Sequence, residues 1–236
     1  LPGREGATQR PQGRNDGTQR WRDLLFLHWP VPEASLASLL PPSLNVDTFD
    51  GQAWLGIVPF AMVDVKPRWL PGGGLSFLET NVRTYVHRDG RDPGVWFFSL
   101  DAASWLAVQA ARLGWSLPYY HAKMSTTEAD GIIRYETRRA DGVGIDCRYR
   151  RLDPLGPSEV GGLQHFFLER YVLYASRRGQ LVRGQVHHDP YPAYGAELIA
   201  HCENLSAASH VPVQGAPTHV HASPGVDVEV FGIRPC

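Results

Sequence analysis

The segment NVDTFDGQAWLGIVPF, residues 45–60, contains two runs in which apolar and polar side chains alternate, joined by Asp50-Gly51. Aspartate followed by glycine is typical of a two-residue hairpin turn, because both central positions of such a turn require positive φ. We therefore predict a β-hairpin here, and a fold that is rich in β-strand from its early part onward.

On the amino-terminal side, LLFLHW (24–29) is an apolar run of the length of a buried strand, and 32–40 begins with proline like a short helix. Residues 1–20 contain one leucine as their only large apolar residue. Such a segment cannot offset its ordering entropy by burial. We therefore predict a flexible arm over 1–20 and a single folded domain over 21–236.

On the carboxyl-terminal side, further strands and short helices follow at regular spacing. Hairpins are predicted in 79–100 and 170–188, and single strands at 131–139, 144–152 and 225–233. A helix is predicted after an N-cap at Asp101, and a second, short helix over 163–169. This pattern predicts an α+β fold with one curved or closed, barrel-like antiparallel sheet and a few short helices.

The charges nearly cancel, since 23 Lys and Arg face 24 Asp and Glu. No overall field therefore directs the protein to nucleic acid or to an anionic membrane, and a small molecule is the expected partner.

The sequence has neither a membrane-spanning apolar run nor the apolar core of a signal peptide, so we predict a cytoplasmic location. The three cysteines lie far apart, which argues against a disulfide framework.

Only two lysines, Lys66 and Lys123, are available for Schiff-base chemistry. Lys66 precedes a proline in a loop rich in proline and glycine, and we expect it to be exposed. Lys123 follows two tyrosines in YYHAKM, where an extended chain would place Tyr119, His121 and Lys123 on one face. Burial beside aromatic rings would make this amine nucleophilic, whereas the alternative is a solvated lysine on the outer face of a strand.

Arg83 lies in ETNVRTYVH and shares one face of this predicted strand with Asn81 and Tyr85. An arginine inside a cavity is suited to a carboxylate ligand, because its charge persists and its geometry is bidentate. The alternative is a structural ion pair with Glu79, Asp101 or Glu169.

Ten histidines raise the question of a metal site. The candidates are the pair His187 and His188, and the pair His219 and His221, which would share one face of a strand. Zinc or iron requires three convergent ligands, and the local sequence contains only pairs. We therefore expect no metal and no cofactor, and instead histidines that bind backbone carbonyls near a cavity.

Several blocks between Trp21 and Phe231 occur in a distinctive order: PxxLxVDTFDGxAWLGIVPF, ETNVRTYV, GVWFFSLDA, ARLGWSLPYYHAKM, FFLERYVLY, VHHDPYP and SPGVDVEVF. Nearly the whole chain thereby resembles the YqjF-like family of uncharacterised bacterial proteins, which is grouped with the acetoacetate decarboxylase superfamily. The resemblance implies a barrel-like antiparallel sheet around an interior cavity. It also favours a homo-oligomer.

Acetoacetate decarboxylases have two adjacent lysines after a glycine- and proline-containing turn, and one of them forms the Schiff base. In the stretch that resembles this turn, GWSLP (114–118), Tyr119 and Tyr120 occupy the two lysine positions. Tyrosine cannot form an imine. Lys123 lies at least about 10 Å further along an extended strand, so imine chemistry there requires a different substrate pose.

The sequence therefore predicts a decarboxylase-like cavity that binds or transforms a small carbonyl- or carboxylate-bearing molecule, with a lyase-like reaction if it is an enzyme. The predicted site residues are, for catalysis, Tyr119, Tyr120 and Lys123, and for substrate binding, Arg83, His121 and Glu169. The alternative is a non-catalytic ligand-binding or sensing module, which predicts a mainly apolar cavity without strongly shifted pKa values. Convergence of Arg83, Tyr120 and Glu169 in one pocket would favour the enzyme.

Overall fold

The computed structural model describes residues 5–115 and 117–236, in which twelve strands form one sheet accompanied by short helices. The strands are β1 (Gly17–Val31), β2 (Asn45–Val46), β3 (Ala53–Pro67), β4 (Leu75–Arg88), β5 (Arg91–Ala102), β6 (Tyr119–Ala129), β7 (Ile132–Arg139), β8 (Gly144–Pro154), β9 (Val172–Arg177), β10 (Gln180–His187), β11 (Tyr194–Glu203) and β12 (His219–Pro235). The helices are the 3-10 helix η1 (Glu5–Thr8) and α1 (Glu33–Ala37), α2 (Trp105–Trp115), α3 (Leu163–Leu168) and α4 (Leu205–Ala208).

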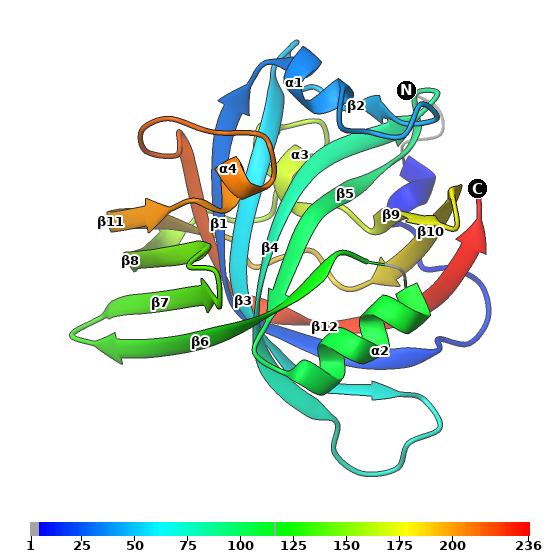
Figure 1. The fold of residues 1–236 in the computed structure, drawn as a ribbon, viewed down its shortest axis with the longest axis horizontal. Helices are drawn as coiled ribbons and strands as arrows, with labels where there is room; N and C mark the ends of the chain where they lie inside the picture. The colour runs from blue at the N-terminus through cyan, green and yellow to red at the C-terminus, as the bar shows by residue number, and fades with distance from the viewer. Residues whose placement is uncertain (1–4, 116) are drawn as a thin grey trace.

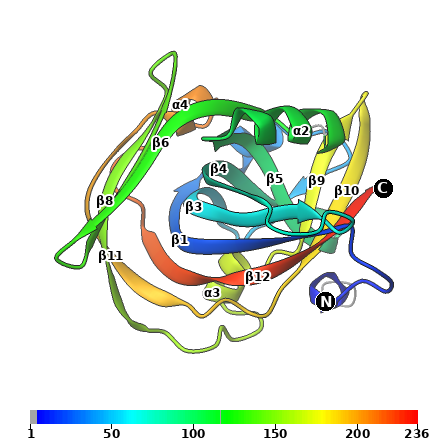
Figure 2. The ribbon, with the colours of Figure 1, turned by 90° about the horizontal axis from the view of Figure 1, so that it is seen from below.

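The sheet is curved and closes on itself, as predicted (Figure 1). The strand order is β10-β9-β5-β6-β7-β8-β11-β12-β1-β3-β4-β2, with additional pairings β10–β12 and β5–β4. One closed path therefore runs through β1, β3, β4, β5, β9, β10 and β12. A second path shares β12, β1, β3, β4 and β5 and returns through β6, β7, β8 and β11 (Figure 2). The pairing is antiparallel except where β5 meets β6 and β9.

Strand β1 buries both of its faces over LLFLHW, which explains why this stretch is almost entirely apolar. Leu24 and Phe26 of β1 belong to the core inside the first path, whereas Leu25, Leu27 and Trp29 belong to the core inside the second. Because successive side chains of a strand point to opposite faces, this part of β1 presents apolar residues to both cores, with the fully buried His28 among them.

The Asp50-Gly51 turn forms as predicted, but the hairpin extends for only one bridge. Asp50 and Gly51 both have positive φ, 48° and 77°, and the backbones of Phe49 and Gln52 exchange two 2.9 Å hydrogen bonds. Beyond this bridge, β2 pairs with β4 and not with β3. The reason is that β3 already has β1 and β4 on its two edges.

The predicted hairpins of β4 with β5 and of β9 with β10 are confirmed by their pairing. The domain boundary predicted at residue 20 falls inside β1, which begins at Gly17. Part of the predicted arm is packed on the sheet, because Ala7 is buried and Arg10 forms an ion pair with Glu229. Residues 1–4 of that arm lie outside the described residues.

The prediction that Asp101 caps the following helix is wrong. Asp101 lies within β5, and its fully buried carboxylate accepts hydrogen bonds from Nε and Nη2 of Arg139, at 2.6 and 3.2 Å. Ser104 is at the start of α2 instead, where its Oγ accepts a hydrogen bond from the backbone N–H of Ala107. Local sequence cannot distinguish a capping carboxylate from one that is paired across the sheet.

None of the helices in the described part of the chain combines the length and the apolar character that crossing a bilayer would require.

Candidate functional site

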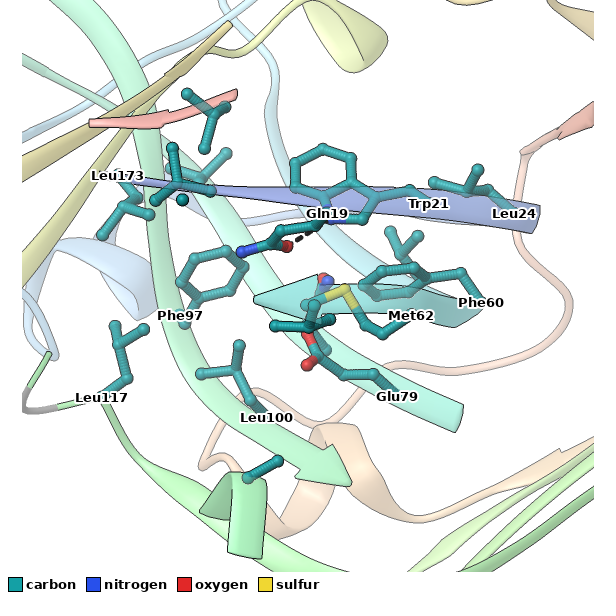
Figure 3. A pocket seen from close by; sticks show the side chains of 18 of the residues that line it. Gln19, Trp21, Leu24, Phe60, Met62, Glu79, Phe97, Leu100, Leu117 and Leu173 are labelled. Carbon is teal, nitrogen blue, oxygen red and sulfur yellow. Dashed lines mark hydrogen bonds between the residues drawn. The ribbon is translucent and has the colours of Figure 1, made fainter. Parts of the chain in front are cut away.

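A cavity of about 480 Å³ lies inside the first closed path of strands. Its walls are mostly apolar and aromatic, and Figure 3 shows Trp21, Phe60, Met62, Phe97 and Leu100 around it. Sites of small organic ligands have volumes of about 300–1,000 Å³ and consist largely of such residues, with a few polar groups that fix orientation.

Strand β4 contributes three adjacent polar groups to this cavity, and further polar residues such as Gln19, Tyr119 and Arg170 line it from other elements. Leu75, Phe77, Glu79, Asn81 and Arg83 all line it, whereas the intervening residues of the strand point to the other side. The period of two of a strand thus produces a row that is apolar at one end and polar at the other.

Glu79 is a buried acid in this row, with 3% of its surface exposed. Its Oε2 accepts a 2.8 Å hydrogen bond from the hydroxyl of Tyr119. Burial raises the pKa of Glu79 to about 8, and the nearby charge of Asp101 adds to this rise, while the bond from Tyr119 opposes it. Near neutral pH the carboxyl is therefore mostly protonated and can donate a hydrogen bond or a proton.

Arg83 and Asn81 have polar atoms without partners among the residues that the structure describes. Arg83 donates from Nη2 to the backbone carbonyl of Phe167 at 3.1 Å, but its Nε has no acceptor and its guanidinium forms no ion pair with any described carboxylate. The buried Oδ1 of Asn81 has no donor within the same ranges of the chain. Unpaired buried groups are costly, and a ligand with both acceptor and donor atoms would satisfy them.

The structure places two of the predicted site residues, Arg83 and Tyr119, on the cavity wall. Tyr120, His121 and Lys123 lie outside it. Tyr120 is 41% exposed, with the guanidinium carbon of Arg139 at 3.9 Å from its ring centroid. His121 and Lys123 are exposed on β6.

The prediction that Tyr119, His121 and Lys123 share one face of an extended strand is wrong. Tyr119 and Ala122 are buried, whereas the residues between them are exposed. The reason is a change of partner: β6 pairs in parallel with β5 as far as His121, and in antiparallel fashion with β7 from Ala122 onward. Ser116, which precedes this strand, lies outside the described residues.

Glu169 lies behind the cavity wall. Its carboxylate accepts a 2.6 Å bond from the hydroxyl of Tyr171 and a 3.1 Å bond from the backbone N–H of Tyr191. Both tyrosines line the cavity, and burial raises the pKa of Glu169. This carboxyl can therefore position part of the wall, although Arg83, Tyr120 and Glu169 do not converge on one pocket.

Lys66 lies at the rim of the cavity, in a strand and partly buried, whereas the sequence predicted an exposed loop lysine. It lies near the end of the long strand β3, and 26% of its side chain is exposed. Its Nζ donates to the carbonyl of Gly72 at 2.9 Å and is 3.0 Å from the carboxylate of Asp64. Its Nζ is thus already engaged by two oxygen atoms, which makes Lys66 a poor candidate for imine formation.

Sequence reasoning missed Glu79 as a site residue. The available signal was the spacing of Glu79, Asn81 and Arg83, three polar residues at every second position of a strand whose other members are mostly apolar. This spacing predicts a common face, but only closure of the sheet converts that face into the wall of a cavity.

The histidine pair His219 and His221 lies on one face of β12, as predicted, with ring centroids 6.5 Å apart. His28 is close to His221, with ring centroids 6.4 Å apart, and its Nε2 is hydrogen-bonded to the hydroxyl of Tyr85. Burial lowers the pKa of all three imidazoles. These three uncharged imidazoles thus add polar groups to the core on the far side of Arg83 from the cavity.

Comparison with known families identifies the chain. Residues 18–227 match the family model DUF2071, described as an uncharacterized conserved protein. The chain belongs to the DUF2071 family. A relative in this family, the uncharacterized protein YqjF of Bacillus subtilis (strain 168), is 34% identical over 220 residues, which cover 92% of this chain and 90% of YqjF. The resemblance to YqjF-like proteins is thereby confirmed.

Solved structures show that this DUF2071 chain has the fold of acetoacetate decarboxylase-like proteins. Acetoacetate decarboxylase from Legionella pneumophila has a TM-score of 0.66 and 13% identity, with 100% of this chain and 96% of that chain covered. The enduracididine biosynthesis enzyme MppR complexed with pyruvate has a TM-score of 0.65 and 12% identity, with 96% and 93% covered. At such identities the similarity shows the fold alone.

Proposed function

We propose that the cavity binds a small molecule that carries a carboxylate and a carbonyl group, with Arg83 as the partner of the carboxylate and Glu79 as a proton donor to the carbonyl oxygen. The observation that carries this proposal is that an arginine without a described carboxylate partner and a buried carboxyl with a raised pKa lie on one wall of a mostly apolar cavity. The fold of the pyruvate-bound MppR is consistent with it.

The chemistry follows from the charges. Arg83 keeps its charge when it is removed from water, so it can bind an anion at the polar end of the cavity. A protonated Glu79 can donate its proton to a carbonyl oxygen, and the enol forms as the α-carbon either loses carbon dioxide, whose bonding electron pair becomes the C=C bond, or gives its proton to water. Imine formation inside the cavity has little support, because Lys66 is paired at the rim and Lys123 is outside.

A non-catalytic binding or sensing module is the second candidate, and the mostly apolar lining of the cavity favours it. The two candidates differ in what happens to a bound 2-oxo acid in D2O. An enzyme that uses Glu79 would exchange the protons next to the carbonyl for deuterium, and Glu79→Gln would abolish the exchange. A binding module would leave the NMR signal of these protons unchanged.

We expect Arg83→Met to weaken the binding of 2-oxobutyrate by about 10- to 100-fold, because a hydrogen-bonded charge contributes about 1.5–3 kcal/mol. Isothermal titration calorimetry measures the dissociation constant, and a thermal melt checks that the variant is folded. Arg88→Met, at an exposed position of the same strand, is the matched control and should bind normally. Equal affinity of Arg83→Met and wild type would contradict the carboxylate role of Arg83.

The cytoplasmic location, the homo-oligomer and the absence of a nucleic-acid partner stay predictions.

A further inference from the structure

We infer that the ligand of this cavity carries an apolar tail, which runs from the polar end at Arg83 along β3 and β4 to the rim at Lys66. The inference rests on the proposed function for the position of the carboxylate. It adds the class of the ligand, an amphipathic oxo acid in place of a short one.

The shape of the cavity supports a tail. Its lining on β4 extends from Leu75 to Arg83, eight residue steps, or about 26 Å along an extended strand. The polar end is closed by α3, where the fully buried Phe167 accepts a hydrogen bond from Arg83 through its carbonyl. The other end reaches the surface, where Leu75 is 45% exposed. The cavity is thus longer than a three- or four-carbon oxo acid requires.

Most of the lining between the two ends is suited to hydrocarbon, and its polar side chains Gln19 and Tyr119 are already hydrogen-bonded to Trp21 and Glu79. On β3 the cavity is bounded by Val58, Phe60 and Met62, and Figure 3 shows Phe97 and Leu117 across from this strand. These side chains have no hydrogen-bonding groups to recognise a polar substituent. A methylene buried among them adds affinity by leaving water, whereas a short ligand would leave this part of the cavity without contacts.

The experiment is a titration of wild-type protein with unbranched 2-oxo acids of increasing length. Each added methylene should tighten binding by about fourfold, which corresponds to about 0.8 kcal/mol, until the tail reaches the rim. Beyond that length the affinity should level off, because further methylenes stay in water. Affinity that does not change with tail length would overturn the inference.

The two methionines of the chain provide a matched pair of variants. Met62→Trp places a larger side chain in the tail region and should reduce the affinity for long oxo acids to that for short ones. Met124→Trp, outside the cavity on β6, should bind both as wild type does. Met62→Phe serves the same purpose if a melt shows that the tryptophan variant is unfolded. Tight binding of long acids by a folded Met62 variant contradicts the tail position.

The Arg83→Met variant shows whether a negative result overturns the inference of an apolar tail or the proposed function itself. If short oxo acids bind in an Arg83-dependent manner but longer ones bind no better, the function stands and the tail is wrong. If affinity rises with tail length but each acid binds to Arg83→Met as tightly as to wild type, the carboxylate is not held at Arg83. That result overturns the proposed function and, with it, the orientation inferred for the tail.

Discussion

Relative to Glu79→Gln, the wild-type protein is expected to lose stability as the pH rises from about 5 to about 9, because the comparison cancels the buried histidines, whose lowered pKa values act in the opposite direction. The pKa of Glu79 rises from its usual value of 4.5 to about 8 in the folded protein. Between these values the folded state holds a proton that the unfolded chain has released, so raising the pH favours unfolding. A shift of this size corresponds to at most about 5 kcal/mol.

Denaturant titrations at a series of pH values measure this effect. The glutamine of Glu79→Gln keeps the volume of the side chain and can still accept the hydrogen bond from Tyr119, so the variant should be the more stable protein at pH 9. Glu128→Gln, at an exposed position of β6, is the control and should follow the wild-type curve. If Glu79→Gln has the same pH dependence as wild type, Glu79 is ionised in the folded state and cannot be the proposed proton donor.

Arg139→Met is expected to lower the free energy of unfolding by about 3–5 kcal/mol, because it leaves the buried charge of Asp101 without its partner. Asp101 is fully buried and Arg139 is 8% exposed, and two hydrogen bonds join them. Burial raises the pKa of Asp101 even though Arg139 opposes this, so the carboxylate depends on its partner to stay charged. Urea unfolding at pH 7 measures the loss.

Two further variants test the cause of that loss. The double variant Arg139→Met with Asp101→Leu should recover much of the stability, because a buried ion pair can often be replaced by apolar residues at little cost. Arg138→Met, at the neighbouring exposed position of β7, should change stability by less than about 0.5 kcal/mol. An equally unstable double variant would show that the packing of Arg139 on Tyr120, and not the charge of Asp101, explains the effect.

The local elements of the fold were predictable where turn chemistry and side-chain alternation agree. The turn at Asp50-Gly51 formed at the predicted residues, and the hairpin predicted in 170–188 turns at Arg178-Gly179, where both residues have positive φ. The partner of β2 was not predictable, since it depends on which strand edges remain free after the sheet has closed.

The candidate site was predictable only in part, for a similar reason. Arg83 and Tyr119 were recognised and line the cavity, whereas Glu79 was considered only as an ion-pair partner. Lys123 attracted attention because lysine is rare in this chain, yet its strand changes partner just before it and leaves it exposed. A change of partner strand has no marker in the local sequence.

The sequence by itself determined the family, the strand-rich character and the row of polar residues on ETNVRTYV, because these depend on residue order and on the period of two of a strand. The tertiary structure alone decided which face of each strand borders the cavity, how deeply Glu79 is buried and which partner Asp101 has. The physical reason is that burial and charge pairing depend on residues far apart in the chain. Their energies arise only when the closed sheet excludes water from between them.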